Sequence, residues 1–149
     1  MASNFHAGAV LLCGRGVLVA GPSGAGKTAL CLTLLDQARL HGYAARLVCD
    51  DQVLLSVASG GRLIAAAPPA IAGLVELRGF GPAPVAAEAR MVVDLLVRLV
   101  DPAAAPRIAD DGFAELEGCR VPALDLPARF AAGAARAVAG MLRLPPFGP

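Results

Sequence analysis

The stretch GPSGAGKTAL, residues 21–30, decides the fold, because its first eight residues match the pattern G-x-x-x-x-G-K-[ST]. The aliphatic run GVLVA at 16–20 precedes it and predicts a buried strand. After it, apolar residues recur at helical spacing from Lys27 to about His41, and Gly42 provides a stop signal. The sequence therefore predicts a strand, a glycine-rich loop and a helix in that order, the context in which this pattern binds phosphate.

The glycine-rich loop has the chemistry of an anion site. Its glycines permit backbone angles that point successive N–H groups inward, and the positive end of the helix dipole adds to their attraction for phosphate. Lys27 is the only lysine among thirteen basic residues; its compact ammonium fits a loop wrapped around phosphate better than the planar fork of arginine. Thr28 can place its hydroxyl on Mg²⁺. We predict that nucleotide phosphates are bound by Gly21, Pro22, Ser23, Gly24, Ala25, Gly26, Lys27 and Thr28.

Two adjacent carboxylates close the next predicted strand. In ARLVCDDQVLLSV, residues 45–57, Asp50 and Asp51 stand between two apolar runs. Side chains alternate along a strand, so consecutive aspartates can face the same way only if the strand ends there. One of them can support Mg²⁺ and Thr28 while the other points at the acceptor of a transferred phosphate. A solvated turn is the alternative interpretation.

A second polar pair lies in LVELRGFG, residues 74–81. Glu76 and Arg78 alternate with apolar residues, so they would share one face of a strand. A carboxylate for Mg²⁺ beside a guanidinium for phosphate would be coherent chemistry. A surface ion pair explains the same spacing.

The rest of the chain is rich in predicted strands and poor in helices. Apolar runs bounded by turn signals predict strands near 8–13, 62–66 and 119–126, and an alanine-rich helix at 128–143. The run RMVVDLLVRLV at 90–100 fits either period, and its β-branched content favours a strand. Two helices are fewer than a doubly wound nucleotide kinase needs. We expect one domain over residues 1–144 and a proline-rich tail at 145–149.

Composition narrows the class of partner. Thirteen basic and twelve acidic residues give a net charge of +1 without a basic run, so we expect no nucleic acid as partner. Every apolar run is broken before 18 residues, so we expect no membrane segment and a soluble, cytoplasmic protein. The four cysteines contain no C-x-x-C pair and are interpreted as small buried hydrophobes.

Three further features resemble the C-terminal catalytic domain of HPr kinase/phosphorylase, in the short single-domain form found in alphaproteobacteria. They are His6, fifteen residues before Gly21, the strand ending in LVCDDQV, and VELRGFG at 75–81. The resemblance covers most of the chain. It implies an α/β fold with a P-loop core, a mixed, strand-rich sheet and few helices. It also implies the use of ATP and Mg²⁺, HPr or an HPr-like carrier as partner, and a homo-oligomer, by analogy a hexamer.

The resemblance also implies roles for individual residues. Asp51 matches the catalytic carboxylate, and His6 matches the active-site histidine. Thr28 and Glu76 look like magnesium ligands, with Asp50 beside them, and Arg78 is the candidate phosphate or substrate ligand. Arg107, in APRIADD, is aligned with an arginine that stabilises the transferred phosphate. Inorganic phosphate would be the co-substrate of the reverse reaction.

Some residues depart from the family pattern. Pro22 and Ala29 stand where the family usually has Asp and Glu. The basic phosphorylase segment is represented by Pro127 and Arg129 alone, which favours kinase activity over phosphorylase activity. Two alternatives stay open, a small-molecule P-loop kinase and an ATP-binding regulatory module without catalysis.

Overall fold

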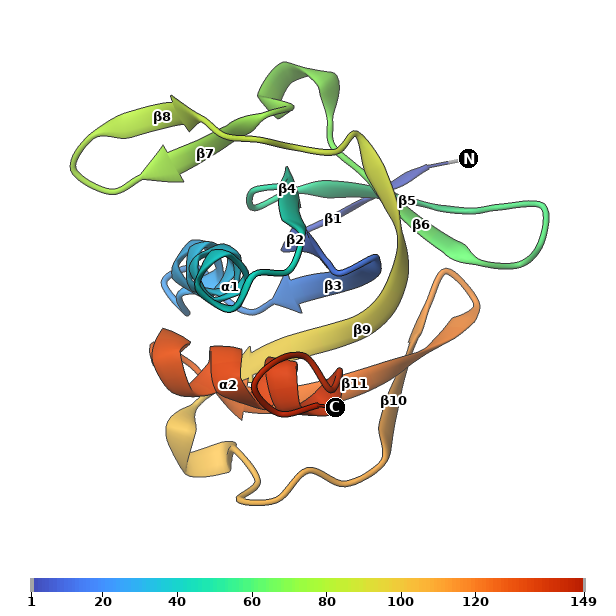
Figure 1. Cartoon of the computed structure of the whole chain (residues 1–149). Helices are drawn as coiled ribbons and strands as arrows, with labels where there is room; N and C mark the ends of the chain where they lie inside the picture. The colour runs from blue at the N-terminus through green and yellow to red at the C-terminus, as the bar shows by residue number, and fades with distance from the viewer. Residues whose placement is uncertain (1, 149) are drawn as a thin grey trace.

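The computed structural model describes residues 2–148 and shows a curved, strand-rich sheet with two α-helices packed against one face (Figure 1). The strands are β1 (Ser3–Phe5), β2 (Ala7–Leu12), β3 (Arg15–Ala20), β4 (Ala45–Cys49), β5 (Val53–Val57), β6 (Leu63–Ala66), β7 (Leu74–Leu77), β8 (Gly81–Pro84), β9 (Arg90–Val100), β10 (Gly112–Leu116) and β11 (Cys119–Pro127). The helices are α1 (Lys27–His41) and α2 (Ala131–Met141), with short 3₁₀ turns η1 (Pro69–Ile71) and η2 (Pro102–Ala104).

Strand β9 joins two parts of the sheet. Its first residues pair antiparallel with β6, and from Val93 onward it runs parallel to β3, with β11 parallel on its other edge. The strand order is β1-β5-β6-β9-β3-β2-β4, and β10 is attached through β11. Strands β7 and β8 form a separate two-stranded hairpin. The sheet is therefore mixed, as expected for this fold class.

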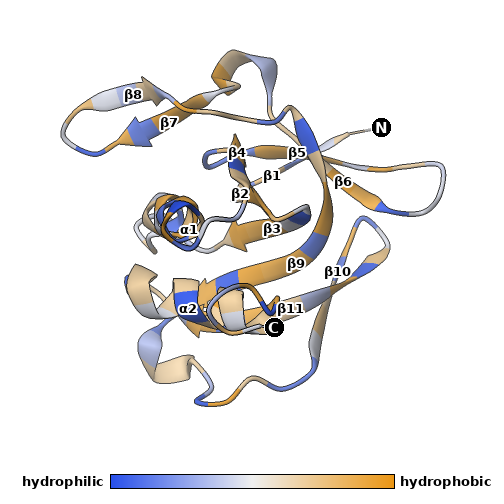
Figure 2. Cartoon of the chain, viewed as in Figure 1, coloured by the Kyte–Doolittle hydropathy of each residue, from blue (hydrophilic) through white to orange (hydrophobic). Residues whose placement is uncertain are grey.

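Two apolar clusters cover the two faces of the sheet. Val17 and Val19 of β3 point into the cluster that packs under α1 and α2, whereas Leu18 between them belongs to the cluster on the opposite face. Figure 2 shows the central strands as the most hydrophobic part of the chain. Both faces of β3 are buried, so this strand holds the glycine-rich loop at a fixed place.

A glycine sets the approach of β3 to β9. A Cβ atom built on Gly16 would lie 1.9 Å from the carbonyl oxygen of Val92, a distance that no side chain tolerates. The register between the two strands shifts at this point, between Gly16 and Val17.

The strand, loop and helix around residues 16–41 are confirmed, and 90–100 is a strand. Helix α1 ends as expected at Gly42, whose φ of 75° is left-handed and whose N–H donates to the carbonyls of Ala38 and Arg39. Within residues 2–148, no helix combines the length and the apolar character that crossing a membrane requires.

Three expectations were wrong in detail. The predicted helix at 128–143 begins only at Ala131, because Arg129 adopts a left-handed φ of 57° that breaks it from β11. The segment Gly81–Pro84, expected to be a turn from its glycine and prolines, is strand β8, since pairing with β7 overrides that composition. Cys13 is exposed in the turn after β2, so not every cysteine is a buried hydrophobe.

Candidate active site

The glycine-rich loop, residues 21–26, uses one backbone donor internally, the N–H of Ala25, which donates to the Pro22 carbonyl at 3.1 Å. Gly24 and Gly26 have left-handed φ values of 82° and 92°, which a residue with a Cβ rarely adopts. Gly26 caps α1 without any side-chain hydrogen bond, and the first turn of the helix contains no acidic residue. No side chain of the cap or of the first turn therefore accepts hydrogen bonds from the N–H groups at this helix end, which suits an anionic ligand.

Lys27 is held beside the loop by backbone carbonyls. Its Nζ donates to the oxygen of Gly21 at 2.9 Å and to that of Pro22 at 3.2 Å. The side chain is only 6% exposed, and Nζ lies 3.8 Å from Oδ1 of Asp51. A buried ammonium with these partners is a fixed positive charge at the mouth of the loop.

Asp50 links three segments of the site. Strand β4 ends at Cys49, and the Asp50 carboxylate accepts a hydrogen bond from Oγ1 of Thr28 at 2.7 Å through Oδ1. Its Oδ2 accepts from the backbone N–H of Glu76 at 2.8 Å. The carboxylate thus joins the start of α1 to the hairpin β7–β8.

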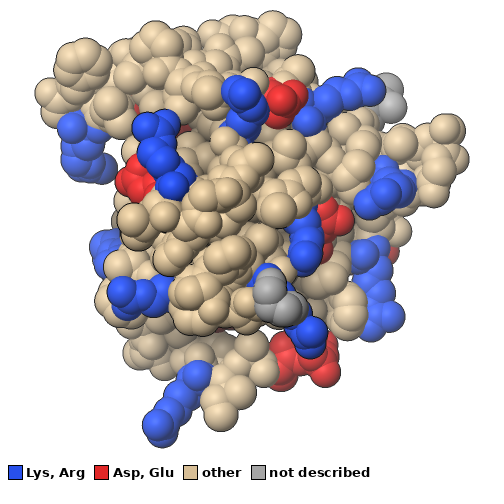
Figure 3. All heavy atoms as spheres, viewed as in Figure 1, with Lys and Arg blue, Asp and Glu red and all other residues tan. Residues whose placement is uncertain are grey.

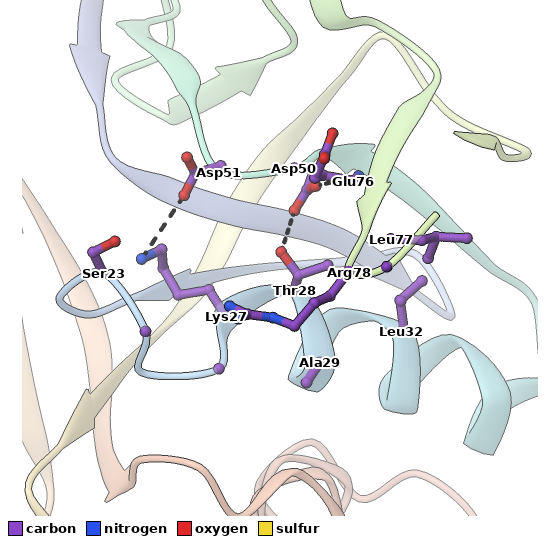
Figure 4. A pocket seen from close by; sticks show the side chains of 13 residues that line it. Ser23, Lys27, Thr28, Ala29, Leu32, Asp50, Asp51, Glu76, Leu77 and Arg78 are labelled. Atoms are coloured by element: carbon purple, nitrogen blue, oxygen red, sulfur yellow. Dashed lines mark hydrogen bonds and ion pairs between the residues drawn. The ribbon is translucent and has the colours of Figure 1, made fainter. Parts of the chain in front are cut away.

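Asp51 occupies a strained backbone conformation. Its φ is 72°, and the N–H of Gln52 donates to the carbonyl of Asp50 at 2.9 Å, the i to i+2 bond of a γ-turn with a left-handed centre. The buried Cys49 thiol contacts the backbone carbonyls of Asp50 and Gln52, on either side of Asp51 in the chain. This turn lets two consecutive aspartates both face the glycine-rich loop, one toward Thr28 and one toward Lys27 (Figure 4).

His6 completes a small polar group around Asp51. Its Nε2 lies 2.7 Å from Asp51 Oδ1, and the two side chains are 53% and 59% exposed. His6 lies between β1 and β2, and β1 pairs with β5, the strand that follows Asp51 in the chain. One carboxylate oxygen therefore has an imidazole and an ammonium as neighbours, while the carboxylate stays open to solvent.

The aspartates, the loop and the hairpin enclose one cavity of about 730 Å³. Figure 4 shows Glu76 next to Asp50 and Arg78 in front of the first turn of α1. The lining residues are Ser23, Gly24, Gly26, Lys27, Thr28, Ala29, Leu32, Asp50, Asp51, Glu76, Leu77, Arg78 and Gly79.

Most predicted site residues come together, and one does not. Three loop residues do not line the cavity: Gly21, Pro22 and Ala25. His6 does not line it either, but it contacts Asp51, which does. Arg107 is exposed on the segment between η2 and β10 and does not line the cavity.

Arg129 lies against the glycine-rich loop, a contact that the sequence analysis did not predict. Its N–H donates to Ala25 at 2.9 Å, and its Nη1 is 3.5 Å from the Gly24 oxygen. The sequence signal for this residue is the partial match of Pro127 and Arg129 to the basic phosphorylase segment of the family.

Two thiols beneath the aspartates are held in the neutral form. Complete burial, with the Asp50 charge as a smaller contribution, raises the pKa of Cys31 far above its usual range. Burial also raises the pKa of Cys49, with hydrogen bonding to the Gln52 carbonyl opposing the shift. These thiols act as small apolar groups, which confirms for both of them the interpretation made from the sequence.

The oxygen donors present fit a magnesium ion. Thr28 and Asp50 are already in hydrogen-bond contact at 2.7 Å, and the Glu76 carboxylate faces the same cavity. Mg²⁺ prefers hard oxygen ligands and is usually held by one or two carboxylates together with substrate phosphates and water. Hydroxyl and carboxylate oxygens of these three residues meet that preference.

A family model described as the HPr serine kinase C-terminal domain matches residues 1–136. The chain belongs to this family. The chain is also similar in sequence to three curated relatives, each named HPr kinase/phosphorylase. Identity is 36% over 76 residues for the Mycoplasma mycoides protein, 35% over 78 for the Lacticaseibacillus casei strain BL23 protein and 41% over 68 for the Brevibacillus brevis protein.

These alignments cover parts of both proteins. They include 51%, 52% and 46% of this chain, in the same order, but only 22%, 23% and 20% of the relatives. The chain thus matches less than a quarter of the length of each relative. A solved structure of the Hpr(Ser) kinase/phosphatase from Coxiella burnetii is similar over 95% of this chain and 88% of the solved chain, with a TM-score of 0.78 and 25% identity. The strand-rich architecture with two α-helices is therefore that of the family.

Proposed function

We propose that this chain is an ATP- and Mg²⁺-dependent protein-serine kinase that acts on HPr or an HPr-like phosphocarrier. The observation that carries the proposal is the open Asp51 carboxylate, which has His6 at 2.7 Å and Lys27 at 3.8 Å and lies beside a glycine-rich loop at a helix N-terminus without an acidic residue in its first turn. A site that only bound nucleotide would have little need of an exposed carboxylate in a strained turn. The family membership supplies the class of phosphoryl acceptor.

The residues divide the work of phosphoryl transfer. Asp51 accepts the proton of the target serine as its oxygen attacks the γ-phosphorus of ATP, and ADP leaves. Lys27 and the loop N–H groups bind the β- and γ-phosphates and offset the charge that builds on the equatorial oxygens. His6 holds the Asp51 carboxylate in position by the hydrogen bond to Oδ1. When bound to Thr28, Asp50 and Glu76, Mg²⁺ would neutralise phosphate charge.

The reverse reaction uses the same carboxylate. Inorganic phosphate bound at the loop would attack the phosphorus of phosphoserine, giving pyrophosphate, while protonated Asp51 returns its proton to the leaving serine oxygen. Arg129, whose Nη1 lies 3.5 Å from the Gly24 oxygen, is a basic residue beside this loop that the kinase steps leave unused. We further propose a cytoplasmic location and a homo-oligomeric assembly, both of which rest on the family resemblance.

The direct test incubates the chain with ATP, Mg²⁺ and the HPr-like phosphocarrier of the same organism, followed by intact-mass and peptide mass spectrometry. We expect an added mass of one phosphoryl group on a carrier serine. A matched reaction with a carrier whose serine is replaced by alanine should stay unmodified. A wild-type reaction that leaves the carrier unchanged, with ATP binding intact, would overturn the protein-kinase proposal.

A further inference from the structure

The cavity has two ends of different chemistry. At one end lie Lys27, Thr28 and the two aspartates, which are polar and charged. At the other end the lining consists of Ala29, Leu32, Leu77 and Gly79, with Arg78 at the rim. In Figure 4 Leu32 on α1 and Leu77 on the hairpin face one another, on the side away from Ser23 and Lys27.

Helical spacing places the apolar end next to the phosphate-binding end. Leu32 follows Thr28 by four residues and Ala29 by three, so all three side chains lie on one face of α1. One turn of helix, about 5.4 Å, separates Thr28 from Leu32 along the axis. Leu77 lies across from them on β7, the strand that also contributes Glu76.

The two leucines are available to a ligand. Both are only partly buried, although each packs its inner side against the core cluster beneath α1. Their solvent-facing sides line an open cavity that is already continuous with the glycine-rich loop. A volume of about 730 Å³ is in the range of pockets that bind small organic ligands.

We propose that the purine base of the nucleotide lies between Leu32 and Leu77, and that this contact discriminates weakly among purines. The inference deepens the proposed kinase function and rests on it. Aliphatic side chains contact the flat faces of a base, which adenine and guanine share. The hydrogen-bonding edge distinguishes them, and the charged side chain at this end is Arg78, which is exposed, so water competes for its donors, and these suit the N7 acceptor that both bases share.

The first test compares three ligands by calorimetry with the full chain in the presence of Mg²⁺. We expect ATP and GTP to bind with dissociation constants within about threefold of each other, and inorganic tripolyphosphate to bind at least about tenfold more weakly than ATP. Equal affinity for ATP and tripolyphosphate would overturn this inference and leave the phosphate site intact. A preference of tenfold or more for one purine would overturn the weak discrimination.

A failure of the proposed kinase function would give a different binding result in the same experiment. If neither ATP nor tripolyphosphate binds, the loop is not a nucleotide-phosphate site, and the kinase proposal falls together with the base contact.

The second test uses alanine variants of the two leucines. Truncation removes part of an apolar contact and leaves every charge near the phosphates unchanged, so we expect Leu32→Ala and Leu77→Ala each to weaken ATP about fivefold. Tripolyphosphate should change by less than about twofold. Leu40→Ala is the matched control, because Leu40 lies on the same helix, is 79% exposed and is outside the cavity.

Two outcomes of the variants would contradict the base contact. Unchanged ATP binding in both leucine variants would show that the base lies elsewhere. Parallel losses for ATP and tripolyphosphate would show that the leucines support the loop rather than the base. Because two independent positions are tested, one on α1 and one on β7, poor folding of a single variant leaves the other to decide.

Discussion

At the scale of single residues, the conformation of Asp51 limits what can replace it. The left-handed φ of 72° is tolerated by asparagine and glycine much better than by other residues. Asparagine keeps the shape of the side chain but cannot accept a proton from serine. It therefore separates the chemical role of the carboxylate from its structural role.

We predict that Asp51→Asn retains nucleotide binding and loses transfer by roughly 10² to 10⁴ fold, the usual contribution of a general base. Phosphate incorporation into the carrier and calorimetric ATP affinity would be measured on the same preparation. Asp36→Asn on the exposed side of α1 is the control and should behave as wild type. Normal turnover in Asp51→Asn would mean that another group accepts the proton.

Lys27 is confined by the carbonyls of Gly21 and Pro22, with 6% of its side chain exposed. The guanidinium of arginine is wider and planar, and it cannot occupy that space without displacing the loop. We predict that Lys27→Arg weakens ATP binding at least about tenfold although the charge is kept, as equilibrium dialysis would show. Arg129→Lys, the converse change next to the loop, should have a smaller effect. Wild-type affinity in Lys27→Arg would contradict the confinement argument.

At the scale of elements, the hairpin β7–β8 is attached to the molecule at few points. It is not part of the main sheet. Val75, which is 4% exposed, is its buried residue, and the partly buried Leu77 and Ala83 pack against the same core cluster. The N–H of Glu76 is bound to the Asp50 carboxylate. A change at Asp50 should therefore affect the position of the hairpin before it affects the sheet.

We predict that Asp50→Ala increases hydrogen exchange in residues 74–84 without changing exchange in α2, because the hairpin loses its polar anchor. Exchange would be followed by mass spectrometry of peptic peptides, with Asp36→Ala as the matched control. Unchanged exchange in the hairpin would show that Val75 and the neighbouring backbone bonds hold it by themselves.

The sequence predicted elements well where their signals were local. The loop at 21–28 lies between β3 and α1 and the pair Asp50 and Asp51 follows β4, as patterns of a few residues predicted. The contacts of Leu77 with the cavity and of Arg129 with the loop join segments far apart in the chain, so no short pattern could reveal them. Strand β8 reads as a turn because GPAP contains two prolines, which a two-stranded hairpin tolerates at its edges.

At the scale of the whole molecule, alanine, valine and leucine build both apolar clusters. The charged residues on the face seen in Figure 3 are separate groups among neutral surface rather than one basic stripe. The Cys31 thiol lies fully inside the cluster beneath α1, with its pKa raised by burial. Because folding raises the pKa of this thiol, the free energy of unfolding depends on pH.

An unfolded thiol ionises near pH 8.5, whereas native Cys31 keeps its proton well above that pH. The unfolded state therefore binds fewer protons in alkali, and the free energy of unfolding should fall from about pH 8.5 upward, by about 1.4 kcal/mol per pH unit for one thiol. Urea unfolding under reducing conditions at several pH values measures this slope. Cys31→Ala should flatten the slope relative to wild type, and Cys13→Ala, at an exposed position, should leave it as it is. Identical slopes in all three proteins would contradict the argument.

The central place of β9 has a consequence for the order in which the site can form during synthesis. Every residue that lines the cavity lies between Ser23 and Gly79, and His6 precedes them. Strand β3, which carries the loop, is paired on one edge with β9, a strand that begins only at Arg90. A nascent chain that ends just before Arg90 thus contains the complete set of cavity side chains without the neighbour that fixes β3. The ability to bind phosphate should appear on the ribosome only after the residues of β9 have left the exit tunnel.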